Sequence, residues 1–160
     1  MNKLLMHAWP SSQYLTQPVR AYQDHFRSLN IPSDDELEGR YKATFIGPAF
    51  LRYIAPKLLP LGGLKGWYGK AFSQETRAIN LLDQKGRLIE RVPMERAITQ
   101  SKFDLRNALV LTYGPEAPLP LRALRDEFRW LDQKTLLGIT IVDLPILRRI
   151  VLPFLLRREE

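Results

Sequence analysis

From residue 39 onward the chain is a succession of short segments in which apolar and polar residues alternate. Residues 39–47 read GRYKATFIG, where Tyr41, Ala43 and Phe45 alternate with polar side chains, a pattern typical of a half-buried β-strand. Similar segments follow at short intervals, separated by turn residues such as QKG at 84–86. Strands at this spacing, without intervening helices, predict an all-β sandwich or barrel. We expect an antiparallel, calycin-like β-barrel of eight or nine strands, a number sufficient to enclose one small ligand.

The N-terminal part has a different period. Val19, Tyr22 and Phe26 are spaced three and four residues apart, which predicts one helix with an apolar stripe. A capping pattern at 33–36 predicts a short second helix. A further helical turn or two, bounded by prolines, is expected within 48–60, with apolar side chains packing inward. Those side chains are Phe50, Leu51, Ile54 and Leu58.

The length of 160 residues corresponds to one domain. We divide residues 1–160 into a helical N-terminal segment (1–38), packed on a β-barrel (39–160). The chain has no cysteine, which excludes disulfides and thiolate chemistry. It shows neither a convincing signal peptide nor a membrane-spanning apolar run, so a cytoplasmic location is expected.

The formal net charge of +7 makes this a basic protein. A basic surface attracts anionic partners, but nucleic-acid-binding proteins usually show clustered lysine and arginine within a recognisable module. Here the charges alternate with apolar residues along the predicted strands, as expected for solvated strand faces. The apolar, arginine-rich C-terminal stretch leaves weak contact with an anionic membrane as an alternative.

The stretch GWYGKAF, residues 66–72, invites comparison with a phosphate-binding loop. It lacks the required glycine and lysine spacing, and a strand rather than a helix is predicted to follow. Glycine within a strand more often marks a bulge or a bend, so we interpret this stretch as a bent strand at the mouth of the barrel. On an ideal strand, Trp67 and Gly69 share one face, predicted to be the interior, while Tyr68 and Lys70 lie on the other.

The stretch DEFRWLD, residues 126–132, alternates in the same way. Asp126, Phe128 and Trp130 share one face, and Glu127 and Arg129 share the other. Glu127 and Arg129 are close enough along the strand to form a pair or to flank a polar ligand, since a guanidinium matches a carboxylate. The alternative is a charged row that faces outward.

These stretches resemble a known family. The matching stretches are GWYGKAF (66–72), DEFRWLDQKTLLG (126–138) and FLLRR (154–158). They are similar to an uncharacterised bacterial family whose members carry an N-terminal GXWXG motif followed by a domain of unknown function. The resemblance covers residues 36–158. Tyr41 and Ala43 stand where that motif has tryptophan and its second glycine, which makes the chain resemble a divergent member.

More distantly, the first predicted strand resembles those of lipocalin-like and haem-binding, nitrobindin-like barrels. This resemblance implies an antiparallel barrel with an interior cavity. A haem barrel of this kind needs an axial histidine near the end of the chain. The histidines here are His7 and His25, both ahead of the predicted barrel, so no cofactor and no metal is expected.

The leading hypothesis is non-enzymatic binding of a small, largely apolar molecule, with or without an anionic end, inside the barrel. It requires an interior void of about 300 Å³ or more. The candidate ligand-binding residues are Trp67, Tyr68, Lys70, Phe128, Arg129, Trp130 and Ile139, with Lys70 or Arg129 meeting an anionic end. One alternative is an enzyme that acts on a similar ligand through Lys70, Asp126 and Arg129. Another is a basic surface module that binds an anionic membrane or nucleic acid.

Overall fold

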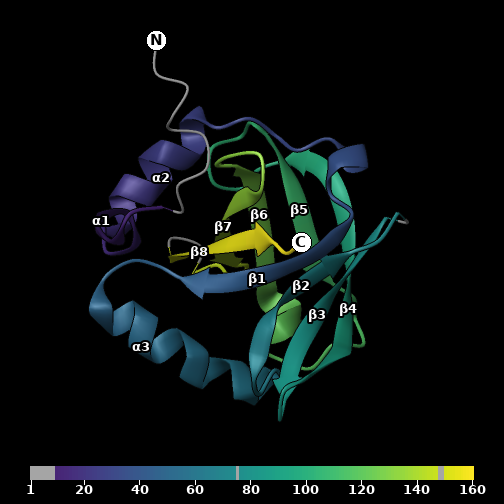
Figure 1. Cartoon of the computed structure of the whole chain (residues 1–160). Coiled ribbons are helices and arrows are strands. Elements are labelled where there is room, and N and C mark those ends of the chain that lie inside the picture. The colour runs from purple at the N-terminus through teal and green to yellow at the C-terminus, as the bar shows by residue number, and fades with distance from the viewer. Residues whose placement is uncertain (1–9, 75, 148–149) are drawn as a thin grey trace.

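The computed structural model describes residues 10–74, 76–147 and 150–160. Eight antiparallel strands form a closed barrel in which each strand pairs with its neighbours in sequence and the last pairs with the first (Figure 1). This confirms the predicted fold class. The strands are β1 (Gly39–Phe45), β2 (Trp67–Phe72), β3 (Arg77–Gln84), β4 (Arg87–Gln100), β5 (Asn107–Tyr113), β6 (Leu124–Trp130), β7 (Thr135–Val142) and β8 (Val151–Arg158).

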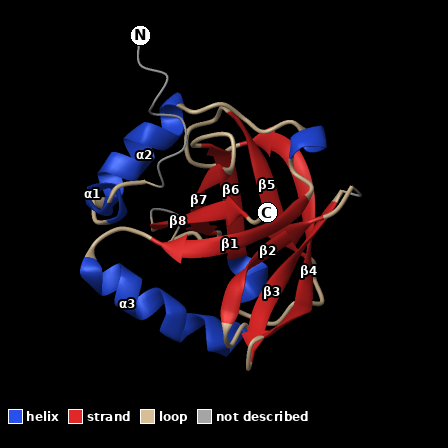
Figure 2. Ribbon diagram, viewed as in Figure 1, coloured by secondary structure: helices blue, strands red, loops and turns tan. Residues whose placement is uncertain are grey.

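The helices lie outside the barrel and over its ends (Figure 2). They are α1 (Ser12–Leu15), α2 (Val19–Ser28), α3 (Ala49–Leu58) and the short 3₁₀ helices η1 (Asp34–Glu36), η2 (Leu59–Gly62) and η3 (Leu121–Ala123). The predicted stripe of α2 buries Tyr22 and Phe26 against the outer face of the sheet, next to Ile139 and Leu155. None of the helices in the described residues is long and apolar enough to cross a membrane.

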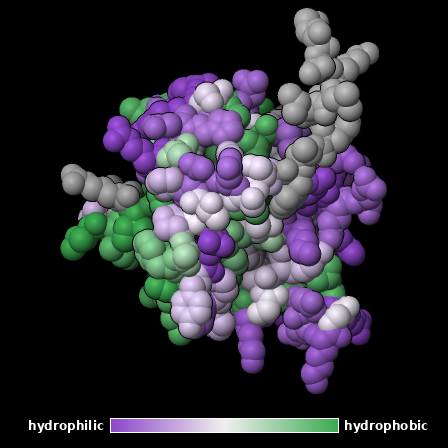
Figure 3. Space-filling view, turned by 60° about the vertical axis from the view of Figure 1, so that its left-hand side comes forward, coloured by the Kyte–Doolittle hydropathy of each residue, from purple (hydrophilic) through white to green (hydrophobic). Residues whose placement is uncertain are grey.

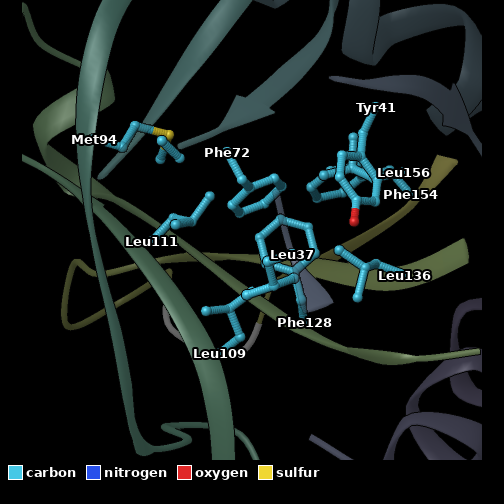
Figure 4. Close-up of a cluster of buried hydrophobic side chains, with 11 residues drawn as sticks. Leu37, Tyr41, Phe72, Met94, Leu109, Leu111, Phe128, Leu136, Phe154 and Leu156 are labelled. Atoms are coloured by element: carbon cyan, nitrogen blue, oxygen red, sulfur yellow. The ribbon is translucent and has the colours of Figure 1, made fainter. Parts of the chain in front are cut away.

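One half of the barrel interior is solidly packed (Figure 4). The rings of Phe72, Phe128 and Phe154 meet edge to face, with centroid separations of 6.5 Å and 5.4 Å along the series. Gly138 makes room for two of these rings, because a Cβ there would lie 2.7 Å from the Phe128 ring and 2.9 Å from the Phe154 ring. The rings separate an apolar cavity at the α3 end of the barrel from a wider and more polar hollow at the Trp130 end.

The stretch GWYGKAF forms β2, and it is bent. The pairing of β2 with β3 shifts register between Trp67 and Gly69, which is a β-bulge. At Gly69 the neighbouring strand approaches so closely that a Cβ would overlap the Tyr41 carbonyl oxygen. The bulge corrects the predicted alternation: Trp67 and Lys70 both face the interior, although they are three residues apart.

The helix predicted within 48–60 is α3, but its side chains do not pack as expected. It lies across the end of the barrel where β1 ends and β2 begins, which we call the mouth. Leu51 is half-buried and faces the barrel, whereas Phe50 and Ile54 are exposed. The prediction that all the apolar residues of this segment pack inward is wrong, because a helix lying over a barrel end has one side in contact with the barrel.

Candidate functional site

A cavity of about 250 Å³ lies between α3 and the interior of the barrel. Its walls are almost entirely apolar. They come from the ends of the strands at the mouth, from α3, and from the segments around η2 and η3. Representative wall residues are Phe45, Leu51, Ala55, Leu64, Leu121 and Phe154. An apolar pocket with a few converging polar groups is the usual form of a small-molecule site.

The polar groups lie together at the floor of this cavity. The Lys70 ammonium lies 3.1 Å from a carboxylate oxygen of Asp126, and both side chains are buried. The Thr140 hydroxyl donates a hydrogen bond of 2.7 Å to the other oxygen of the same carboxylate. Tyr113 also faces the cavity, with its ring centroid 5.8 Å from the Lys70 nitrogen. Strands β2, β5, β6 and β7 each contribute one of these side chains.

Asn80, fully buried on β3, holds this floor in place. Its side-chain oxygen accepts hydrogen bonds from the Lys70 ammonium (2.9 Å) and the Trp67 indole (3.0 Å). Its amide nitrogen donates to the Val92 carbonyl (2.9 Å) and to the Tyr113 hydroxyl (3.2 Å). Asn80 therefore fixes the orientation of three cavity residues at once, as a supporting residue of a binding site does.

The charge state of the floor follows from its contacts. Burial disfavours the charged form of Lys70, but the neighbouring Tyr113 and Asp126 outweigh it and raise the pKa of this lysine above its usual value. Burial also raises the pKa of the Tyr113 phenol. Near neutral pH the floor therefore presents an ammonium, a carboxylate and a neutral phenol, with no net charge.

The floor retains hydrogen-bonding capacity. A carboxylate offers about four lone-pair positions, of which Lys70 and Thr140 use two at Asp126. The third proton of the Lys70 ammonium points to the Met94 sulfur at 3.2 Å, and a thioether is a weak acceptor. A ligand hydroxyl can thus donate to Asp126, and a ligand oxygen can compete for Lys70.

The cavity includes two of the predicted ligand-binding residues, Trp67 and Lys70. Phe128 faces the interior but belongs to the packed half of the barrel. Trp130 lies at the barrel end opposite α3, where its indole donates a hydrogen bond of 3.3 Å to Glu36. Phe128 and Trp130 do not line this cavity, because the aromatic cluster fills the barrel between the two ends, and Trp130 instead lines the hollow at its own end.

Tyr68 and Ile139 lie on the outer surface of the barrel, which corrects their predicted place in the cavity. Tyr68 points outward, on the face opposite Trp67 as simple alternation requires, and its hydroxyl donates to the Glu159 carboxylate, a hydrogen bond that raises the pKa of Tyr68 to about 12. Ile139 is buried beneath α2, beside Phe26. In this barrel an outward-facing position can be buried, because a helix covers part of the wall.

Arg129 also lies outside the barrel, fully buried between the wall and α2. Its guanidinium binds Asp104 through two contacts of 2.5 Å and 2.8 Å, and donates a hydrogen bond of 2.9 Å to the Phe26 carbonyl. The guanidinium carbon lies 4.3 Å from the centre of the Phe26 ring. Arg129 thus anchors α2 and the β4–β5 connection to the barrel, and it does not reach the cavity.

The predicted pairing of Glu127 with Arg129 is replaced by other contacts. Glu127 accepts hydrogen bonds from the Ser101 hydroxyl and, at 2.8 Å, from the Arg125 side chain. The Glu127 and Arg129 side chains both lie on the outer side of the barrel wall, as the alternative prediction of an outward-facing row had it, but they are buried rather than facing solvent. The prediction did not anticipate that the β4–β5 connection folds over this row and buries it.

Sequence reasoning missed three residues of the site: Asn80, Tyr113 and Thr140. Asn80 offered a signal, because it interrupts an otherwise apolar inward face formed by Ala78 and Leu82. A single amide on a buried strand face requires hydrogen-bonding partners nearby. Among the described residues, no group of three histidine, aspartate or glutamate side chains is placed to hold a metal ion.

Comparison with known proteins supports the fold. No protein-family model matches the chain, and no curated protein matches it in sequence. One solved structure, described as a protein from Thermomonospora curvata, is similar over 91% of this chain and 90% of that chain, with a TM-score of 0.64. The two sequences are 19% identical, so the likeness concerns the fold.

Proposed function

We propose that this protein binds a small, largely apolar molecule in the cavity beneath α3, with a neutral polar end, such as a hydroxyl, against Asp126 and Lys70. The observation that carries the proposal is the buried Lys70–Asp126 pair at the floor of an apolar cavity. Burying two charges is costly, and apolar residues of similar volume often stabilise a fold as well or better. Because apolar residues could serve stability as well, the position of the pair beside the cavity is better explained by contact with a ligand.

The charge balance of the floor narrows the ligand class. Asp126 already neutralises Lys70, so an anionic ligand would bring an unbalanced negative charge into a poorly solvated site. A neutral hydroxyl or carbonyl would add hydrogen bonds without that cost. The possibility of an anionic end, left open by the sequence, is therefore the less favoured form of the proposal.

The size of the cavity narrows the ligand class further. Its volume of about 250 Å³ is smaller than the void of about 300 Å³ that the hypothesis from the sequence required, so that requirement is not met. Pockets for drug-sized ligands span roughly 300–1,000 Å³. The proposal is accordingly restricted to a compact ligand, unless α3 moves outward on binding.

Catalysis is the weaker candidate. The raised pKa values of Lys70 and Tyr113 keep both groups protonated near neutral pH, where they donate hydrogen bonds but do not act as nucleophile or base. The proposed enzyme also required Arg129, which is engaged outside the barrel. Nucleic-acid binding has no particular observation in its favour.

We further propose that the chain is a divergent member of the bacterial family with the GXWXG motif. The support is the barrel itself and the place of the stretches that resemble the family: GWYGKAF supplies the bent strand β2 and two cavity residues. The cytoplasmic location expected from the sequence remains a prediction.

The test begins with native and denaturing mass spectrometry of the protein purified from its own host, which would reveal a carried molecule. Purified protein is then titrated with n-octanol, octanoate and octylamine, following tryptophan fluorescence, since Trp67 lines the cavity. Ala55→Phe fills the cavity from α3, while Ile54→Phe places the same ring on the exposed side of that helix and serves as the control.

We expect n-octanol to bind best, Ala55→Phe to weaken its binding at least about tenfold, and Ile54→Phe to leave it unchanged. Equal binding of n-octanol by Ala55→Phe and Ile54→Phe would show that the ligand does not bind in this cavity. A clear preference for octanoate would overturn the neutral-end assignment and restore the anionic one.

A further inference from the structure

The outer side of α3 and η2 is an unusually apolar surface. Phe50, Tyr53 and Leu61 are 62%, 65% and 71% exposed. The β7–β8 connection adds Ile146, which is 91% exposed, and Leu144. This connection belongs to the same end of the barrel, because the last residue of β7 and the second residue of β8, Val142 and Leu152, line the cavity. We call the surface formed by Phe50, Tyr53, Leu61, Leu144 and Ile146 the mouth face.

Figure 3 shows hydrophobic side chains gathered in one area of the molecular surface, beside strongly hydrophilic regions. Single exposed apolar residues need no explanation, but a contiguous group of large ones marks an interaction site. An all-apolar patch would suit a protein partner or a bilayer equally well. The charges around the patch distinguish between these partners.

The charges on the segment that contains α3 and η2 are basic. The segment 46–66, which contains α3 and η2, carries Arg52, Lys57 and Lys65 and has no aspartate or glutamate. The Lys57 ammonium lies 3.4 Å from the centre of the exposed Tyr53 ring. In the β7–β8 connection, the carboxylate of Asp143 is paired with Lys102 at 2.5 Å. The charges within α3, η2 and their flanking residues are thus basic, and the exposed acidic residues at this end, Asp83 and Glu116, lie at the end of β3 and on the β5–β6 connection.

We propose that the mouth face docks onto the surface of an anionic lipid bilayer, with α3 lying in the interface. Exposed Phe, Tyr and Leu side chains bordered by lysine and arginine are the composition of interfacial segments. Each basic residue near an anionic leaflet strengthens binding by about 1 kcal/mol, or roughly fivefold. The charge complementarity favours a bilayer over a second copy of this chain, which carries the same basic segment.

This docking goes beyond the proposed ligand binding and does not depend on it. It would bring the barrel mouth to the bilayer, so that an apolar molecule could pass beneath α3 without crossing water. No residue of α3 is fully buried in the barrel, which is consistent with a helix that can exchange contacts.

The test is sedimentation of the full chain with vesicles of phosphatidylcholine alone and with added phosphatidylserine, at low and at high salt. The variant Phe50→Ser/Leu61→Ser removes two side chains of the mouth face. The matched control, Leu105→Ser/Ile31→Ser, removes two exposed apolar side chains outside it, 70% and 41% exposed.

We expect binding to the phosphatidylserine vesicles that weakens with salt and falls at least about tenfold in the first variant but not in the control. Equal losses in the two variants, or no binding by the wild type, would overturn the proposal. Concentration-dependent dimers that disappear in Phe50→Ser/Leu61→Ser would overturn it in favour of self-association.

Ligand binding and membrane docking can be refuted independently of each other. Ala55→Phe fills the cavity and should retain vesicle binding. Phe50→Ser/Leu61→Ser should retain n-octanol binding in solution, because neither side chain lines the cavity. If both functions were lost together in either variant, a change in folding would be the cause, and circular dichroism would detect it.

Discussion

Replacing Lys70 by methionine should destabilise the protein severely, because it leaves the Asp126 carboxylate buried without its counter-ion. The ammonium and carboxylate are 3.1 Å apart, and their side chains are 2% and 7% exposed. At an effective dielectric constant of about 20, this separation corresponds to an attraction of roughly 5 kcal/mol. Breaking a buried pair from one side typically costs about 3–5 kcal/mol.

The double variant Lys70→Met/Asp126→Leu should behave differently. With both charges gone, no desolvation penalty remains, and the stability should return to within about 1 kcal/mol of the wild type or exceed it. It should nevertheless lose n-octanol binding, since the floor then has neither the carboxylate nor the ammonium. That combination, a stable barrel without its ligand, would show that the pair serves binding rather than folding.

Urea unfolding measures the difference, provided that the m-value stays constant among the variants. In thermal unfolding, we expect the Tm of Lys70→Met to fall by on the order of 10 °C. A loss below about 1 kcal/mol in the single variant would mean that the pair is effectively solvated. If the double variant lost as much stability as Lys70→Met and Asp126→Leu lose separately, added together, the reasoning about desolvation would be refuted.

The same pair gives a pH dependence with a definite sign. The folded-state pKa of Lys70 lies above its usual value, so its contribution to stability is complete below the unfolded-state pKa of about 10.4 and is lost as the pH rises through the folded-state value. Tyr113, whose pKa is also raised, acts in the same direction. The wild type should therefore lose more stability than the double variant between neutral pH and pH values above about 10.4.

Two further predictions concern β2 and α2. Gly69→Ala should lower the free energy of unfolding by about 3 kcal/mol or more, as overpacking of a core does, because the added methyl overlaps the Tyr41 carbonyl. Gly86→Ala is the control: the space around Gly86 is open, so this change should cost only about 1 kcal/mol. Urea unfolding measures both values. Arg129→Lys should lower the free energy of unfolding by about 2–4 kcal/mol, because it loses the two-point contact with Asp104. The affinity for n-octanol should stay unchanged. A changed affinity in a fully folded variant would contradict the structural role of Arg129.

Much of the barrel could be predicted from the sequence because alternation is a property of the individual strand. The grouping of residues into two faces follows directly from it: Asp126 and Phe128 share one face of β6 and Arg129 lies on the other, although alternation alone did not show which face is the interior. The turn at 84–86 was predictable for a similar local reason, since Lys85 and Gly86 both adopt positive φ, as a two-residue hairpin turn requires.

The candidate site was less predictable because its determinants are not local. The bulge at Tyr68 depends on how β2 pairs with β3, and a shift of one position exchanges the inner and outer faces. The burial of Arg129 depends on α2 and Asp104, which are distant in sequence. The cavity itself exists because the aromatic rings fill one half of the barrel and a helix covers the other, and neither arrangement can be inferred from strand periodicity.

The order of strands also determines when the site forms during folding. Successive strands pair as hairpins, which assemble locally and rapidly, whereas β1 and β8 must meet across the length of the chain. Lys70 on β2 and Asp126 on β6 face each other only when the curved sheet has closed. We therefore expect an open meander of hairpins to precede the closed barrel, with both charges still in water. The cost of removing both charges from water is then incurred during closure of the barrel. The ion pair is thus expected to slow this closing step.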